Sequence, residues 1–549
     1  MRKFIQIGES IESNTEYYAD KQRYDVYLKD TVRIKSNLYT SCRDVGISEG
    51  EQDSCMDIAF FMKDKENIVF DFGGATLYLH GIMQPFLLDN CKNITIKNCI
   101  IEYDRSFVSE AEVIESTDAY LKVKMFKNFP YRIEDGNLIL TSETWENNTL
   151  DQAPLFFQLF NSKTREGAGI RLAIVGKNPQ LDESLPWASS TLKLVAKEEG
   201  EYIVFEGKNL PYIETGLILT MAHSNRKYSG MMIIDCENVA LENVRLLNGP
   251  GIGLLPMYTK NLYLDGFKLC YDERSPGIIA NEADGIHAVA CSGDFVLKNC
   301  ILEGMIDDAL NIHSNFYQVI SCEEDKITAL CAGAVSVEYK IFGEGDKIAI
   351  YQGSTLVKSD EYTIKSIRRL EGKTVEITVD RPLGNHQKGD AIENLSAQVN
   401  ILISNCRFGK TNTHLRFQSR GRILIENCAT ELPFWLTGDM SYWFESSPVE
   451  NITIKNTKFT TPQALILSVP EFMPTEAEPY YHGNIVVENC EFVSTVPVSA
   501  SYTRNIRFIG NKSLVGEAMS LELKNCGESE VEGCEVVRKV EEKKGLNVN

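Results

Sequence analysis

The amino-acid sequence predicts an all-β protein, a parallel β-helix (solenoid) with two inserted antiparallel β-barrel-like domains. A short phrase of alternating apolar residues, followed by asparagine and then cysteine or threonine, recurs along the chain. Two long segments lack this phrase but contain strand-like runs. The chain has 549 residues, more than one compact core usually holds, so several domains or one long repeat architecture are expected.

Each copy of the phrase predicts a short strand, a turn at asparagine and a second strand. Asparagine tolerates the left-handed backbone conformation that such a corner needs. Repeats of about this length and β character are typical of a solenoid with Ile, Val, Leu and Cys stacked inside. Chance strand composition is the alternative, which the agreement of the copies disfavours. Six copies end at Cys99, Cys300, Cys406, Cys428, Thr457 and Cys490.

Interruptions of the phrase divide the chain into five predicted parts. Strand-like runs such as Tyr120 to Met125 and Thr374 to Val379 indicate small antiparallel barrels in the two interruptions. The second interruption begins directly after a cluster of aspartates, so we expect it to stand beside them as a wall. The predicted parts are N-terminal coils at 1–105, an inserted β domain at 106–230, central coils at 231–316, a second inserted β domain at 317–396 and C-terminal coils at 397–549.

Composition excludes several classes of partner and site. The net charge of −21 disfavours nucleic acids and anionic membrane surfaces. No apolar run approaches the length of a membrane span. Fifteen cysteines without a Cys-x-x-Cys pair are typical of buried free thiols rather than of disulfides or a zinc site. The first ten residues contain no apolar signal region, so a cytoplasmic location is expected, although a trimmed secreted chain would look the same.

Three aspartates, Asp284, Asp307 and Asp308, are the candidate catalytic groups. If 23 residues make one coil, the step from Asp284 to Asp307 stacks the second acid on the first, on strands about 4.8 Å apart. Clustered carboxylates cannot all ionise cheaply, so one can keep a proton while another activates water. Cleavage of a glycosidic bond needs this pair of groups. An Asp-Asp pair alone would more often be an acidic turn.

Six further residues are candidate substrate-binding groups. A histidine here could bind a sugar hydroxyl or hold a carboxylate, and a structural histidine is equally plausible. The arginine, which we expect on the coil after the acids, is as plausible on the surface, and the tryptophan as plausible in the core. No group of residues has metal-ligand spacing, so neither a metal nor a cofactor is expected. The six candidates are His287, Asn311, His313, Arg416, Trp443 and Glu445.

Several of these segments together resemble glycoside hydrolase family 110, the inverting α-1,3-galactosidases. The most specific piece is Asp308-Ala309-Leu310-Asn311-Ile312-His313 with Asp307 before it. Two departures are Ser314, where glycine is usual in the family, and a weak match over 106–230. The other matching segments are 226–230, 251–255, 283–287, 303–306 and 443–451.

The resemblance implies a right-handed β-helix with β-barrel insertions and the three aspartates as catalytic groups. Likeness to acid assignments on this fold makes Asp307 the general acid, while Asp284 and Asp308 hold and activate water. The implied reaction removes terminal α-linked galactose, 1,3-linked in the family, from an oligosaccharide or glycoconjugate with inversion. The aglycone, the acceptance of N-acetylgalactosamine and the oligomeric state stay open.

Three alternatives are weighed against this interpretation. Polygalacturonase-like enzymes share one Asp plus an Asp-Asp pair, but commonly use an Arg-x-Lys pair for the uronate carboxylate. Here Arg416 is followed by Phe417 and Gln418, which favours a neutral sugar. A non-catalytic carbohydrate-binding β-helix would not need a cluster of three acids. A lyase usually uses calcium or a basic residue, and between Asp284 and Ser314 only Lys298 is available.

Overall fold

The computed structural model confirms the predicted all-β fold class. It describes residues 1–35, 55–148, 155–175, 190–222, 228–271, 277–331, 341–409, 413–438, 440, 443–469, 474–534 and 537–542. Within these ranges the secondary structure is β, apart from one 3-10 turn, η1 (Leu28–Asp30). Consequently no helix in the described part of the chain has the length and apolarity to span a membrane. Arg226 and Lys227, which belong to one matching segment, lie outside the described residues.

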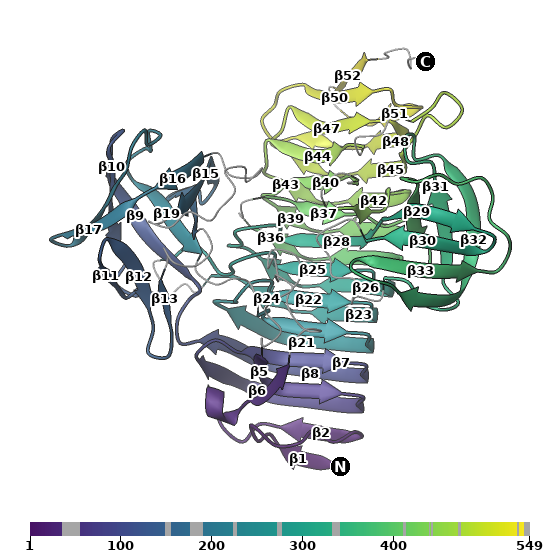
Figure 1. The fold of residues 1–549 in the computed structure, drawn as a ribbon. Coiled ribbons are helices and arrows are strands. Elements are labelled where there is room, and N and C mark those ends of the chain that lie inside the picture. Colours follow the sequence, from purple (N-terminus) through teal and green to yellow (C-terminus); the bar gives the residue numbers. More distant parts are fainter. Residues whose placement is uncertain are drawn as a thin grey trace.

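Two long, predominantly parallel sheets wind together into stacked coils (Figure 1). The 14-stranded sheet runs in the order β4 (Val32–Lys35), β5 (Cys55–Lys63), β7 (Gln84–Asp89), β20 (Met231–Ile234), β22 (Leu254–Met257), β25 (Ile286–Val289), β28 (Leu310–Asn315), β37 (Leu415–Phe417), β40 (Phe434–Leu436), β44 (Gln463–Leu467), β47 (Val496–Ser501), β50 (Met519–Lys524) and β52 (Val537–Glu542), with β41 (Glu445–Ser446) paired to β28.

The 21-stranded sheet closes the other sides of the coils. Its strands pair in parallel from one coil to the next, as the repeated phrase predicts. The strands are β1 (Arg2–Phe4), β2 (Thr15–Tyr18), β3 (Arg23–Tyr27), β6 (Glu66–His80), β8 (Lys92–Tyr103), β21 (Glu237–Leu247), β23 (Lys260–Asp265), β24 (Lys268–Leu269), β26 (Ser292–Lys298), β27 (Ile301–Leu302), β35 (Val399–Ser404), β36 (Arg407–Phe408), β38 (Arg422–Glu426), β39 (Ala429–Thr430), β42 (Asn451–Lys455), β43 (Lys458–Phe459), β45 (His482–Glu488), β46 (Glu491–Phe492), β48 (Thr503–Ile509), β49 (Lys512–Ser513) and β51 (Ser529–Glu532).

Asparagines turn the chain at the corner of the coils, as expected. Asn427 and Asn456 have φ angles of 56° and 50°, in the left-handed region that asparagine tolerates. The Asn456 side-chain amide donates to the Asn427 side-chain oxygen at 3.2 Å, and Asn261 donates to Asn238 at 2.9 Å. These bonds join consecutive coils along the outside. The described cysteines are free thiols, and most of them are buried, as the sequence predicts.

Two insertions interrupt the coils. The first is an eight-stranded sheet, antiparallel except where β15 meets β16, together with a three-stranded sheet. The second is a closed six-stranded barrel. The first comprises β9 (Val108–Ser116), β10 (Tyr120–Met125), β14 (Leu155–Asn161), β15 (Gly167–Val175), β16 (Ser190–Lys193), β17 (Val195–Glu199), β18 (Tyr202–Glu206) and β19 (Leu217–Ala222), with β11 (Tyr131–Glu134), β12 (Asn137–Thr141) and β13 (Glu146–Asn148). The barrel comprises β29 (Tyr317–Glu323), β30 (Lys326–Leu330), β31 (Lys347–Tyr351), β32 (Lys358–Arg369), β33 (Thr374–Val379) and β34 (Ala391–Asn394).

The two insertions lie at opposite ends of the parallel strands of the 14-stranded sheet. The first precedes β20 in the chain, and the barrel follows β28. Figure 1 accordingly shows the first insertion on the left of the stacked coils and the barrel on the right. Arg420, just after β37, ties the barrel to the coils because its Nη2 atom lies 2.8 Å from both Glu393 Oε2 and the Tyr351 hydroxyl.

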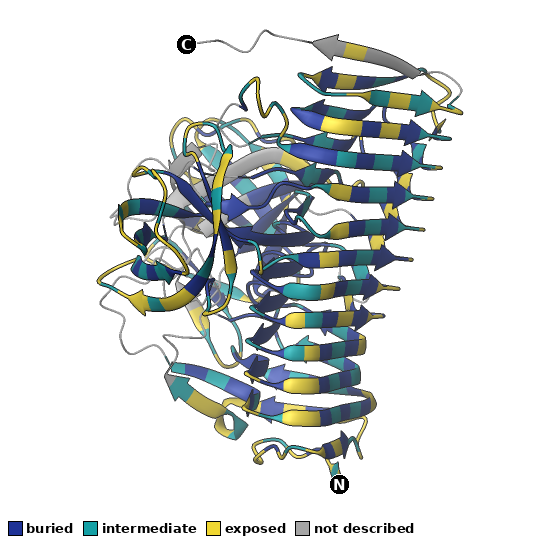
Figure 2. Cartoon of the chain, turned by 90° about the vertical axis from the view of Figure 1, so that its right-hand side faces the viewer, coloured by how far each residue is buried: buried dark blue, intermediate teal, exposed yellow. Residues whose placement is uncertain are grey.

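Side chains of the 14-stranded sheet alternate between the core and the outer face. The strands β22, β25 and β28 are buried along their whole length. In contrast, buried and more exposed residues alternate along the strands on the right of Figure 2. Ile286, Leu310 and Leu415 point into the apolar core. The residue after each of these therefore lies on the outer face. From coil to coil, these outward-facing residues form a row, which is apolar in the earlier coils. In the later coils the row becomes polar and aromatic, and each member lies opposite the next on the following strand: His287, Asn311, Arg416 and Trp435.

Candidate functional site

The acids that face each other on neighbouring coils are Asp284 and Asp308. Gly285 N–H donates to the Asp308 carbonyl oxygen at 2.8 Å, and Ile286 lies opposite Leu310, 24 residues later. The expectation that a 23-residue step stacks Asp307 on Asp284 is therefore wrong. Coil length varies with the loops at the corners, so residue spacing alone does not determine the register to within one residue.

Asp308 is held from the following coil. Its Oδ1 atom accepts a hydrogen bond from the Thr413 hydroxyl and another, at 3.3 Å, from the His414 backbone N–H. Arg416 Nη1 lies 3.9 Å from its Oδ2 atom. A hydroxyl, an amide and a guanidinium together hold the Asp308 carboxyl group in place. Arg416 thus lies on the coil after the acids, as the sequence predicts.

Asp284 begins a chain of contacts between buried side chains. Its Oδ2 atom contacts Nδ1 of His287, which lies three residues later at the start of β25. His287 Nε2 lies 2.8 Å from His313 Nε2, and His313 Nδ1 donates to the Ser314 carbonyl oxygen at 2.6 Å. The two histidines therefore connect Asp284 to the backbone of β28.

Asp307 has a different environment from the other two acids. It is half-buried, whereas Asp284 and Asp308 are buried. Its Oδ1 atom accepts a hydrogen bond from the backbone N–H of Asp308 at 3.2 Å. In the register of the two strands, Asp308 lies directly opposite Asp284. Asp307 comes one residue earlier, so it lies diagonal to Asp284.

Glu445 reaches the site through an unusual strand pairing. Its strand, β41, pairs antiparallel with β28 and places Glu445 opposite Asn315. The Glu445 side chain is fully buried. Its Oε2 atom lies 2.9 Å from Arg416 Nη2, and its Oε1 atom lies 3.6 Å from His313 Nε2. One connected polar cluster therefore runs through Asp284, His287, His313, Glu445, Arg416 and Asp308.

The two tryptophans near the site are placed differently. Trp435 continues the outer row, with the Arg416 guanidinium 5.1 Å from a ring centroid of Trp435 and the His414 ring 4.8 Å away. Trp443 is half-buried and contributes its backbone oxygen, which accepts a hydrogen bond from the Asn315 side chain at 3.3 Å. Both are half-buried, the condition in which an aromatic ring offers a face to a ligand.

Several buried polar atoms on and beside β28 and β37 have no hydrogen-bond partner among the described residues. Among them are Asn311 Oδ1, Ser314 Oγ and both polar side-chain atoms of Gln418. Such atoms cost free energy unless a ligand or water pairs with them. A ligand rich in hydroxyl groups would satisfy them. Gln418 and Thr413 were missed in the sequence, although both fall in the segment that contains Arg416.

A buried glutamate, also missed in the sequence, holds the first insertion against the turn before Asp284. The Glu110 carboxylate, on β9, accepts hydrogen bonds from the backbone N–H groups of Ile278 and Ile279 at 2.9–3.1 Å. Three residues later, the Asn281 side chain donates to the Asp284 carbonyl oxygen at 2.8 Å. Glu110 thus supports the backbone that positions Asp284.

Glu110 is expected to make stability depend on pH. Burial raises the pKa of Glu110 from 4.5 to about 7, against the opposing effects of the two backbone amides and Arg165. A carboxyl whose folded-state pKa is raised stabilises the fold at low pH and loses that effect as pH rises toward 7. Between pH 4.5 and 7 the wild type should lose on the order of 3 kcal/mol of unfolding free energy relative to Glu110→Gln. Urea unfolding of both proteins at pH 4.5 and 7 measures this difference, and parallel pH dependences would contradict it.

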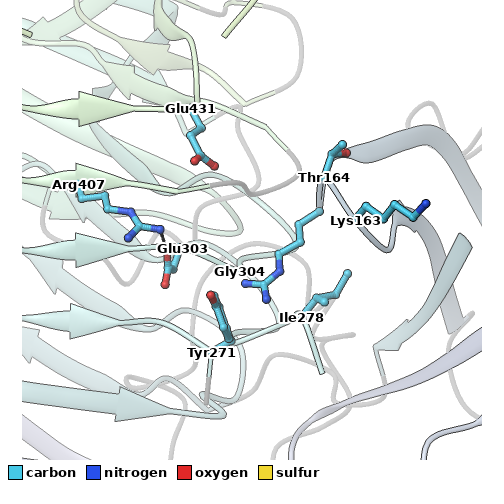
Figure 3. A pocket seen from close by; sticks show the side chains of 9 residues that line it. Lys163, Thr164, Tyr271, Ile278, Glu303, Gly304, Arg407 and Glu431 are labelled. Carbon is cyan, nitrogen blue, oxygen red and sulfur yellow. Dashed lines mark hydrogen bonds and ion pairs between the residues drawn. The ribbon is translucent and has the colours of Figure 1, made fainter. Parts of the chain in front are cut away.

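A cavity of about 320 Å³ lies between the first insertion and the corners of the coils (Figure 3). On one side it is lined by Lys163 to Arg165, from the turn between β14 and β15. On the other side, Glu303 and Arg407 form an ion pair at 3.0 Å. Gly304 also lines the cavity and begins the turn that contains Asp307 and Asp308. The cavity therefore opens beside the turn that holds two of the acids, and its size is at the lower end for ligand pockets.

Curated proteins similar to this chain include several α-1,3-galactosidases. α-1,3-Galactosidase B of Bacteroides thetaiotaomicron is 27% identical over 503 residues, covering 87% of this chain and 77% of that protein. α-1,3-Galactosidase A of Shewanella woodyi is 24% identical, covering 86% of this chain and 77% of its own length. No family model matches the chain. The resemblance predicted from the motifs is thereby confirmed over most of the chain.

Among solved structures, the chain is similar to a family 28 exopolygalacturonase of Yersinia enterocolitica. The two share 11% sequence identity with a TM-score of 0.29, covering 98% of this chain and 74% of that one. A structure titled glycoside hydrolase gives 7% identity and the same TM-score, 0.29, covering 84% of this chain and 89% of that one.

Proposed function

We propose that this chain, a homologue of curated α-1,3-galactosidases, is a glycoside hydrolase that removes terminal α-linked galactose with inversion. The substrate is an oligosaccharide or glycoconjugate that ends in such a galactose, and the 1,3 linkage is the one we expect. The single observation that carries the proposal is the grouping of Asp284, Asp307 and Asp308 beside a face of buried polar atoms that have no hydrogen-bond partner among the described residues.

The register of the acids supports a division of roles. An inverting enzyme needs about 6.5–9.5 Å between its acid and base carboxyls, to leave room for a water molecule. Residues on neighbouring parallel strands are only about 4.8 Å apart, so Asp284 and Asp308 suit one joint task, holding and activating that water. Asp307, diagonal to Asp284 and more exposed, is then the general acid. It protonates the glycosidic oxygen as the bond breaks, while the water attacks the anomeric carbon from the opposite face.

The surrounding residues supply recognition of a neutral sugar. Asn311 Oδ1 and Gln418 provide hydrogen-bonding atoms for hydroxyl groups, and Trp435 and Trp443 provide apolar ring surface. Arg416 is neutralised by Glu445 at 2.9 Å and lies near Asp308, so it is not a free cation for a uronate carboxylate. The cavity between Lys163 and Arg407 is a suitable place for the rest of the glycan beyond the cleaved bond.

Proton NMR of a hydrolysis reaction tests the function and its stereochemistry together. With an α-1,3-galactobiose or a 4-nitrophenyl α-galactoside, the first galactose released should be the β-anomer. Appearance of α-galactose first would overturn the inverting mechanism. Release from α-galacturonides but from no α-galactoside would overturn the substrate class.

A further inference from the structure

The turn between β14 and β15 presents the side chain of Arg165 to the cavity of Figure 3. The backbone of Arg165 has a φ angle of 59°, in the left-handed region that glycine or asparagine usually occupies. Asn161 fixes the turn, because its side-chain oxygen accepts hydrogen bonds from the backbone N–H groups of Lys163 and Thr164 at 2.9 and 3.0 Å. Glycine would form this turn without strain, and strained positions of this kind are common at ligand-binding sites. The turn itself therefore does not account for arginine at this position.

The Arg165 guanidinium lies on an aromatic ring and is not neutralised. Its central carbon is 3.9 Å from the ring centroid of Tyr271, which also lines the cavity. Among the described residues, no carboxylate forms an ion pair with Arg165 or Lys163. Glu110, a buried acid near Arg165, accepts hydrogen bonds from two backbone N–H groups instead. A guanidinium stacked on a ring keeps the N–H groups at its edge free to donate, so Arg165 offers them to a ligand in the cavity.

The charge of the cavity lining is opposite in sign to the charge of the whole chain. Three basic and two acidic side chains line the cavity, a net charge of +1, whereas the chain carries −21. Arg407 is neutralised by Glu303 at 3.0 Å. The charges that remain are those of Lys163, Arg165 and Glu431. A basic lining in an acidic protein attracts anions to this place, while the rest of the surface repels them.

The position of the cavity fits the leaving-group side of the proposed reaction. Gly304 lines the cavity and comes three residues before Asp307, the proposed general acid. The general acid protonates the glycosidic oxygen, so the sugars beyond that oxygen lie on the side of Asp307. These sugars therefore extend past Asp307 toward the cavity, while the terminal galactose occupies the neutral site beside Arg416 and Glu445.

We propose that this cavity is a subsite for an acidic sugar, whose sulfate or carboxylate group is bound by Arg165 and Lys163. The substrate is then a glycan in which a neutral terminal galactose is followed by a sugar that carries an anionic group. Arg165 supplies paired N–H donors, which match the geometry of an oxyanion, and Lys163 supplies a flexible ammonium group at the exposed rim. This inference rests on the proposed function, because it concerns the sugar that is released with the leaving oxygen.

Kinetics on matched disaccharides test the inference. The probes are α-1,3-galactobiose, the same disaccharide with one sulfate at O2, O4 or O6 of the reducing galactose, and α-1,3-galactosyl-galacturonic acid. The wild type should have a kcat/KM about tenfold higher on at least one acidic probe than on the neutral one, because hydrogen bonds to charged groups are the stronger ones. A preference confined to the sulfated probes identifies sulfate as the ligand, and one confined to the galacturonic acid identifies a carboxylate. The inference is overturned if no acidic probe exceeds the neutral one.

Substitutions in the cavity separate an anion site from a site for neutral sugars. Arg165→Gln should bring the acidic and neutral probes to about the same kcat/KM, whereas Arg165→Lys should keep part of the preference. Glu431→Gln should increase the preference, because it removes the unpaired negative charge of the lining. Lys208→Gln is the control, since it removes an exposed positive charge from the same insertion outside the cavity, and it should leave the preference unchanged. Equal losses on neutral and acidic probes in Arg165→Gln would show that the cavity binds hydroxyl groups alone.

Calorimetry with the preferred acidic disaccharide separates failure of this inference from failure of the proposed function. Hydrolysis of neutral galactobiose without any preference for the acidic probes would overturn the anion subsite and leave the proposed function standing. Binding of the acidic disaccharide to the wild type but not to Arg165→Gln, without hydrolysis of any α-galactoside, would support the subsite and contradict the function. Binding at this subsite should weaken as sodium chloride is added, because salt screens the charges.

Discussion

An Asp307→Asn variant is expected to lose about 10²–10⁴-fold in kcat on an α-galactoside with a poor leaving group, such as α-1,3-galactobiose. The same variant should keep most of its activity on an activated aryl α-galactoside. The physical reason is that protonation of the glycosidic oxygen matters only when the leaving group cannot depart unaided. Asparagine keeps the size of aspartate and a side-chain oxygen that can accept the Asp308 N–H, so the local backbone bond can be retained.

Steady-state kinetics on both substrates measure this difference. Asp294→Asn is a suitable control, since Asp294 is an exposed aspartate on β26 of the same coil and lies on the other sheet. It should leave kcat unchanged on both substrates. If Asp308→Asn shows the dependence on the leaving group and Asp307→Asn does not, the roles of the two neighbours are reversed.

The coils and their corners could be predicted because the same structural requirements, a left-handed corner residue and an apolar core, recur in every coil. Each corner requires a left-handed residue, so asparagine recurs at positions such as Asn299, Asn405 and Asn489, whose φ angles are 52–56°. The repeated apolar alternation follows from the core that every coil must fill. A single sequence therefore contains many independent samples of the same structural constraint.

The relative placement of the acids could not be predicted in the same way. The motif contains Asp284, Asp307 and Asp308, but which pair stacks depends on one residue in a loop. The 24-residue register is set by backbone bonds such as Gly285 to Asp308, and no composition signal distinguishes it from a register of 23. A one-residue slip moves a side chain to the opposite face of its strand, so this detail determines the mechanism.

The contacts between segments that are distant in the sequence could not be predicted from the sequence pattern either. Glu445 enters the site because β41 pairs antiparallel with β28, across the barrel insertion. Glu110 belongs to the first insertion and yet supports the turn before Asp284. In both cases the signal was a charged residue in an apolar strand-like run. Burial of a charge requires a specific partner, but the sequence does not say where that partner lies.

Asp284→Asn and Asp308→Asn are each expected to reduce kcat by about 10²–10⁴-fold on the poor and on the activated substrate alike. These two acids are assigned to the attacking water, and removal of its activation slows bond cleavage whatever the leaving group is. The double variant should be no slower than the slower single variant, because groups that act as one unit give strongly non-additive effects.

The geometry makes these substitutions conservative for the fold. Asparagine at 308 can still accept hydrogen bonds from Thr413 and from the His414 N–H, and asparagine at 284 can still accept from His287. Circular dichroism and thermal unfolding should therefore match the wild type closely enough to attribute the losses to chemistry. Near-normal kcat on the aryl galactoside in both single variants would show that Asp284 and Asp308 do not activate the water. The base would then have to be another carboxylate of the cluster, with Glu445, 3.6 Å from His313, the next to be substituted.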